Sequence, residues 1–131
     1  MEERPLHFWD DKEWSEITDT WPSAVKKGFA RRLREVQLGD QPSSNAKPLS
    51  GFGIPLWELW HRRGQRVIYS THYASLTGQI EVLDAFEKDS RHGRVMRTSD
   101  KDRIEARVAA LKGEMEDLTK ALQAQQPRKL N

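Results

Sequence analysis

The chain has 131 residues, which suits one compact domain, and its 22 basic and 20 acidic side chains leave a formal net charge of +2. So small a charge excludes a generally polycationic protein. Cysteine is absent, which excludes disulfides, thiolate metal sites and a cysteine nucleophile. The acidic start, without an apolar run after it, predicts a cytoplasmic protein with neither signal peptide nor membrane helix.

Charge is unevenly distributed along the chain. Residues 1–21 contain seven acidic and two basic side chains, whereas residues 22–39 contain five basic and one acidic. Residues 62–103 are again basic, by nine to six. These blocks predict faces of opposite sign in one fold, but ordinary solvated helices would produce them too. Nucleic-acid binding therefore requires that the basic blocks converge in space.

The N-terminal segment predicts a strand and then a short helix. The aromatic residues 5–9 indicate the strand. Asp10 or Asp11 offers an N-cap, and apolar residues then recur at helical spacing up to Trp21.

A second helix is predicted from residue 23 onward, with Pro22 at its start and Gly39 as its stop. Its apolar face has the helical spacing 4, 4 and 3. This face consists of Val25, Phe29, Leu33 and Val36. Residues 40–55 are rich in Gly, Pro, Ser and Asn and predict a loop.

Three strands are predicted next, over residues 55–61, 66–73 and 79–86, joined by short turns. In the third, alternation would turn Ile80, Val82 and Asp84 to one side. That alternation is imperfect, so it does not assign the core face.

A basic stretch then leads into a long helix that Thr98 or Ser99 would cap. Its apolar positions follow a 3–4 spacing and make almost three heptads. They are Ile104, Val108, Leu111, Met115, Leu118 and Leu122. The part beyond Gly113 either folds back on the domain or acts as an interaction helix for a homodimer or an antitoxin.

The predicted order is therefore β-α-α-β-β-β-α, an α+β fold. Consecutive strands with short turns predict a small antiparallel sheet. Helices before and after the strands would cover one face of it as a single layer.

Three sequence runs carry a resemblance to a known family. Residues 47–59 contain Lys-Pro-Leu and then Leu-Trp-Glu-Leu, residues 65–69 read Gln-Arg-Val-Ile-Tyr, and residues 82–88 read Val-Leu-Asp-Ala-Phe-Glu-Lys. In this order they resemble the phage-derived HigB-like branch of the RelE/ParE toxin superfamily. The resemblance spans about residues 5–111 and implies a toxin domain over 1–112, with a helical extension and tail over 113–131.

The resemblance implies the toxin of a type II toxin–antitoxin system. Such proteins are small cytosolic, metal-independent endoribonucleases that need no cofactor. They hydrolyse mRNA, most often on the ribosome, and an antitoxin, here expected to be of the helix-turn-helix type, neutralises them. This chain has Trp60 and Asp89 where the family often has Arg and Lys. These departures keep open an inactive RelE-fold protein that binds a phage or host partner, or nucleic acid.

The resemblance and the residue chemistry together nominate site residues. Arg66 is expected to clamp phosphate, and the alternative is a cross-strand ion pair with Glu58. Lys47 and Lys88 would bind the same scissile phosphate, and the alternative for each is an ordinary solvated loop lysine.

Proton transfer at neutral pH suits a histidine, and His61 and His92 lie near the basic blocks. We therefore expect either one as catalytic base or acid, although an isolated surface histidine usually has no such role. No metal-ligand spacing stands out, so no metal site is predicted. Further RNA-binding residues are expected at Arg62, Arg63, Arg91 and Arg94.

Overall fold

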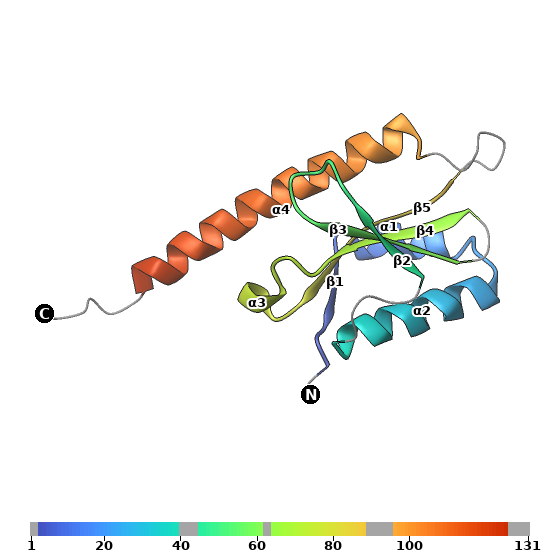
Figure 1. Ribbon diagram of the computed structural model, residues 1–131, viewed down its shortest axis with the longest axis horizontal. Helices are drawn as coiled ribbons and strands as arrows, with labels where there is room; N and C mark the ends of the chain where they lie inside the picture. The colour runs from blue at the N-terminus through green and yellow to red at the C-terminus, as the bar shows by residue number, and fades with distance from the viewer. Residues whose placement is uncertain (1–2, 40–44, 62–63, 89–95, 126–131) are drawn as a thin grey trace, which may run out of the picture.

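A computed structural model describes residues 3–39, 45–61, 64–88 and 96–125. It has an α+β architecture in which one sheet lies between helices (Figure 1). The elements in chain order are β1 (Leu6–Phe8), α1 (Asp11–Thr18), α2 (Ser23–Gln37), β2 (Ala46–Leu49), β3 (Leu56–Trp60), β4 (Gln65–Ser70), α3 (Ala74–Thr77), β5 (Ile80–Glu87) and α4 (Thr98–Gln125).

The sheet has five strands in the order β1-β5-β4-β3-β2 and is mixed. The predicted meander of β3, β4 and β5 is antiparallel, but β1 runs parallel to β5, with Leu6 opposite Ile80. The prediction of an antiparallel sheet was therefore wrong at this edge. The reason is topological, because the first strand joins the last strand of the meander instead of the nearest in sequence.

An additional strand, β2, lies within the segment that composition predicted as a loop. It pairs antiparallel with β3 and places Lys47 opposite Glu58. Pro48 is compatible with this position because β2 is an edge strand, where one missing N–H leaves no ladder bond unmade.

The predicted starts of the first two helices and the end of the second are confirmed, but the first helix ends at Thr18 and does not reach Trp21. Asp10 caps α1, since its Oδ1 accepts a hydrogen bond from the Glu13 backbone N–H at 3.0 Å. Helix α2 begins directly after Pro22 and ends before Gly39, whose φ of 91° is a left-handed conformation.

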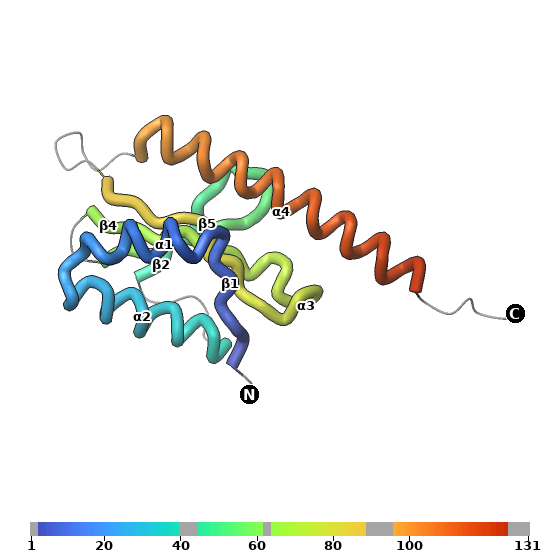
Figure 2. The backbone as a smooth tube through the Cα atoms, turned by 180° about the vertical axis from the view of Figure 1, so that it is seen from behind, coloured from blue at the N-terminus to red at the C-terminus, as the bar shows by residue number. Residues whose placement is uncertain are grey.

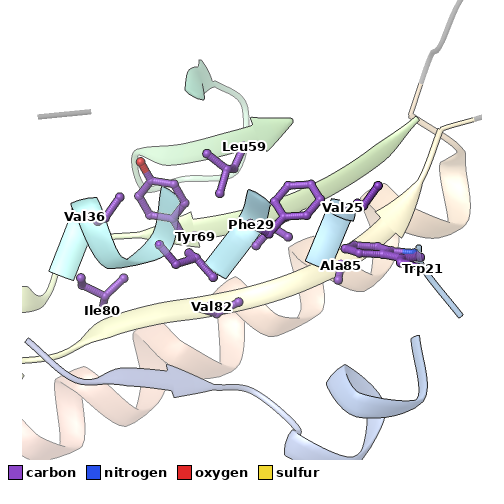
Figure 3. Packing of buried hydrophobic residues seen from close by; sticks show 11 residues of the cluster. Trp21, Val25, Phe29, Val36, Leu59, Tyr69, Ile80, Val82 and Ala85 are labelled. Carbon is purple, nitrogen blue, oxygen red and sulfur yellow. The ribbon is translucent and has the colours of Figure 1, made fainter. Parts of the chain in front are cut away.

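One face of the sheet packs against α1 and α2, as Figures 1 and 2 show. We call its apolar cluster the α2-side core (Figure 3). Its buried members include the whole predicted face of α2. They are Trp21, Val25, Phe29, Leu33, Val36, Leu59, Val67, Tyr69, Ile80, Val82 and Ala85.

The opposite face packs against α4, which makes three layers and corrects the single helical layer that we predicted. The physical reason is that β3, β4 and β5 turn apolar side chains to both faces, so both need a cover. We call this cluster the α4-side core. Its buried members are Ile54, Leu56, Ile68, Leu83, Phe86, Met96, Ile104, Val108, Leu111 and Met115.

A bulge in β5 explains why its alternation looked imperfect. Tyr69 lies opposite Val82 and Ile68 opposite Asp84, so Leu83 is an extra residue in the ladder. Val82 therefore joins the α2-side core, while Asp84 reaches the arginines of α4. The predicted common side for these two residues was wrong.

Helix α4 is a single helix through Gly113 and projects beyond the body of the protein (Figures 1 and 2). Met115 is buried, but Leu118 and Leu122 are 36% and 42% exposed. Packing on the domain thus ends near Met115, and the last apolar positions of the heptad pattern are not covered within it.

Candidate functional site

A cluster of charged side chains surrounds Glu58 on the sheet face that α4 covers in part. The Glu58 carboxylate has no exposed surface. Lys88 Nζ lies 2.7 Å from Glu58 Oε1, and Lys47 Nζ lies 2.9 Å from Oε2. Arg66 Nε is 4.0 Å from Oε1. Three predicted site residues therefore come together around one carboxylate, as the cross-strand alternative for Arg66 requires.

The strand register produces this convergence. Lys47 on β2 lies directly opposite Glu58 on β3, and Arg66 on β4 lies diagonally across, opposite Trp60. Lys88 follows β5, where its backbone N–H donates a 2.8 Å hydrogen bond to the Gly64 carbonyl. A Cβ at Gly64 would lie 2.5 Å from the Lys88 carbonyl oxygen, so only glycine permits this approach.

The electrostatics of the cluster favour an ionised Glu58. Burial acts to raise the pKa of Glu58, but the ammonium groups of Lys88 and Lys47 outweigh it and hold that pKa below the ordinary value. Lys47, Lys88 and Arg66 all lie within 4.0 Å of the single Glu58 carboxylate. The lowered pKa makes Glu58 a poor proton acceptor, and cationic side chains of this kind suit an anion.

A hollow of about 410 Å³ opens beside this cluster and is the place where an anion would bind. Lys47, Glu58 and Lys88 line it, and α4 contributes Lys101 and Glu105. The Lys47 side chain is 53% exposed, whereas those of Arg66 and Lys88 are 8% exposed. Of the three cations around Glu58, Lys47 is thus the one that solvent and a ligand reach most easily. Lys101 was missed because its helix cannot be placed from sequence.

His61, predicted as a catalytic acid or base, lies on the other side of the sheet. Its ring packs beside Phe29 of the α2-side core, with centroids 6.0 Å apart, and against Gly28 of α2. The sheet therefore separates it from Lys47 and Lys88. Among the described residues that line the hollow there is no histidine.

The remaining predicted site residues stay predictions, because they lie outside the described residues. They are Arg62, Arg63, Arg91, His92 and Arg94.

A second ionic cluster joins α1, β5 and α4, and we did not foresee it from the sequence. Asp84 is fully buried and accepts hydrogen bonds from Arg103 at 2.8–3.2 Å and from Arg107 at 2.9 Å. Arg107 also pairs with Glu13 at 2.6 Å, and Arg103 with Asp100 at 2.7 Å. Burial raises the pKa of Asp84 against the opposing effect of the arginines. The nearby cavity measures only about 20 Å³, so this cluster fastens helices and does not bind a ligand.

Tyr69 is buried in the α2-side core. Burial raises the pKa of its hydroxyl to about 12. Trp57 packs on the same core, while Trp60 lies opposite Arg66 on the other face. The two tryptophans of β3 therefore point to opposite faces of the sheet.

The comparisons with known proteins give no match: no family model, curated protein or solved structure is similar to this chain. Within the described ranges, no helix combines the length and the apolar character needed to cross a bilayer. The same ranges contain no group of three or more side chains suited to hold a metal ion.

Proposed function

We propose that this protein is the toxin of a type II toxin–antitoxin system and acts as a metal-independent, ribosome-dependent mRNA endoribonuclease. The observation that carries the proposal is the convergence of Lys47, Arg66 and Lys88 around buried Glu58. These are the cations that the HigB-like resemblance nominates. The ammonium groups of Lys47 and Lys88, which line the adjoining hollow, suit a phosphodiester.

In this mechanism the cluster acts through electrostatics. The 2′-hydroxyl oxygen of the RNA attacks the adjacent phosphorus, and the bond to the leaving 5′-oxygen breaks. Lys47 and Lys88 stabilise the negative charge that builds up on the phosphate oxygens, in positions that Glu58 fixes beforehand. A separate group must take the 2′-hydroxyl proton and another must return one to the leaving oxygen. We assign one of these steps to His92.

The second candidate is a protein of the same fold that binds nucleic acid, or a phage or host partner, without cleaving RNA. The position of His61 behind the sheet favours it, since the described lining of the hollow then lacks a group that titrates near neutral pH. The ribonuclease and a nucleic-acid-binding protein both require anion binding at Lys47, and only the ribonuclease requires cleavage.

Induced expression with growth and transcript integrity as readouts tests the proposal. Wild type is expected to arrest growth and to shorten transcripts, and Lys47→Ala to relieve both. Lys12→Ala, an exposed lysine on α1, is the matched control and should remain toxic. Unchanged growth and intact transcripts with wild type overturn the toxin proposal.

Purified protein separates the two candidates. Cleavage of mRNA in the presence of ribosomes, lost in His92→Ala, supports the ribonuclease. RNA binding that depends on Lys47 but leaves the RNA intact, with and without ribosomes, overturns the ribonuclease and supports the binding protein.

A further inference from the structure

A second and larger hollow, of about 580 Å³, lies between β1, α1 and α2, on the opposite side of the sheet from Glu58. Its floor is apolar and aromatic. The floor is formed by Leu6, Phe8, Trp14, Trp21, Phe29 and Leu33. Pockets that hold small ligands have this volume and this kind of lining. We call this hollow the α2 groove.

The rim of the α2 groove is basic. Lys26, Lys27 and Arg34, all on α2, line it. At 1.5 Å per residue, Lys27 and Arg34 are about 10 Å apart along the helix. An anionic head group would therefore find a cation at either end of the groove.

The acidic side chains near this rim form only weak, exposed ion pairs with its cations, so an anion can compete with them. Lys26 pairs with Asp19 at 3.3 Å and Arg34 with Glu3 at 3.0 Å. All four side chains are between 42% and 71% exposed, and such surface pairs are weak and easily exchanged. Lys27 takes part in no ion pair among the described residues, which makes it the cation best placed for a ligand.

We propose that the α2 groove binds a single-chain anionic amphiphile, a fatty-acid-type carboxylate. Its alkyl chain would lie along Leu6, Phe8 and Trp14, the partly exposed apolar side chains of the lining, and its carboxylate would contact Lys27. This site is distinct from the Glu58 cluster and does not depend on the function proposed there.

A protein partner fits the groove less well than an alkyl chain does. Stable protein interfaces bury roughly 800 Å² on each side and are depleted of charge at their centre. The surface of α2 that borders the groove carries Lys26, Lys27 and Arg34, so a broad contact would cover several cations. A narrow chain uses the apolar floor and leaves most of these charges in water.

The binding test titrates the full chain with octanoate, decanoate and dodecanoate below their micellar concentrations. Calorimetry and tryptophan fluorescence both serve, because Trp14 and Trp21 line the groove. We expect one saturable site and an affinity that rises about fourfold for each added methylene. Dodecanol, which lacks the charge, should bind about two- to fivefold more weakly than dodecanoate.

Three variants locate the site. Lys27→Ala should weaken dodecanoate binding about two- to fivefold and leave dodecanol unaffected. Arg31→Ala, an exposed position on α2 outside the groove, is the matched control and should bind both ligands as wild type does. Ala30→Trp places a large ring in the groove and should abolish binding of both. Circular dichroism and Tm show whether each variant is folded. If Ala30→Trp is unfolded, the comparison of Lys27→Ala with Arg31→Ala decides whether the site is in the groove.

Three results would overturn the proposal. The first is the absence of saturable binding, and the second is an affinity that does not depend on chain length. The third is an acidic amphipathic peptide that binds wild type but not Ala30→Trp while the alkyl carboxylates do not bind, since the groove would then be a peptide site.

Discussion

The two faces of the sheet bury different kinds of side chain. The face under α1 and α2 buries almost only apolar side chains, such as Phe29 and Val36 (Figure 3). The face toward α4 buries ions together with its apolar residues, with Glu58 and Asp84 both inaccessible to solvent. Burying a charge costs several kcal/mol unless it is paired, so the second face depends on its partners and the first does not.

The two carboxylates on the α4 side also differ from one another. The pKa of Glu58 is lowered, with Lys88 and Lys47 outweighing burial, while burial raises the pKa of Asp84 despite its arginines. Acidification therefore removes stability through Glu58 and adds it through Asp84. The difference indicates that Glu58 holds an ionic site in place, whereas Asp84 serves the packing of helices.

The largest effect is expected from Asp84→Ala. The change leaves Arg103 and Arg107 without their buried partner and should lower the free energy of unfolding by about 3–5 kcal/mol in urea. Phe29→Ala on the other face should cost about as much through loss of packing. Only in the Asp84 variant should the loss of unfolding free energy change with pH. The same pH dependence of this loss in both variants would contradict the proposed difference between the two faces.

Glu58→Gln should lower the unfolding free energy by about 2–3 kcal/mol at neutral pH, because Lys88 loses a charged partner while an amide oxygen remains. Since the pKa of Glu58 is lowered from its ordinary 4.5, this stabilisation is present above that pH and is lost as pH falls through the folded-state pKa. Urea unfolding across the acid range should therefore show wild type and variant converging. A constant gap down to strongly acidic pH would contradict the assigned ionisation.

Gly28→Ala tests how tightly the apolar face is packed. The new Cβ would lie 2.4 Å from His61 Cδ2 and force the ring to move. Overpacking of this kind lowers the free energy of unfolding by about 1–3 kcal/mol, and the better helix propensity of Ala offsets about 1 kcal/mol of that loss. Thermal unfolding measures the net loss. Gly113→Ala, with nothing near its added Cβ, is the control and should be stabilising.

The smallest effect on stability is expected from Lys47→Ala. Its side chain is half exposed, so loss of its ion pair should cost no more than about 1 kcal/mol. RNA binding, measured by fluorescence anisotropy at several salt concentrations, should nonetheless weaken and lose about one unit of salt dependence. An unchanged salt dependence would remove Lys47 from the anion site.

Local patterns predicted the parts of this fold that local interactions determine. The face Val25–Phe29–Leu33–Val36 follows from side-chain spacing, and the start of α1 follows from its cap, Asp10. Helix α4 begins at Thr98, so Thr98 and Ser99 are its first residues and not the predicted cap. Composition concealed β2, because an edge strand tolerates the Pro48 and polar neighbours that are typical of loops. The parallel pairing of β1 and the placing of helices on both faces depend on contacts between distant segments.

The candidate site was predicted in part for the same reason. Lys47, Arg66 and Lys88 lie on or next to strands whose register brings them together, so the resemblance was sufficient to group them. His61 was grouped with them by sequence proximity alone, although one more residue along a strand turns a side chain to the opposite face. The ion pairs of Asp84 needed the bulge in β5, which no pattern in the sequence located.

The parallel pairing of β1 with β5 has a consequence for how the chain acquires its structure during synthesis. Leu6 pairs with Ile80, so β1 cannot join the sheet until the chain has been synthesised at least as far as β5. The edge of the sheet and the floor of the α2 groove therefore form only after most of the polypeptide has been made. Closing so long a loop is a slow, entropically costly step. The two early helices therefore emerge with their apolar faces uncovered, and the nascent chain depends on the later strands to bury them.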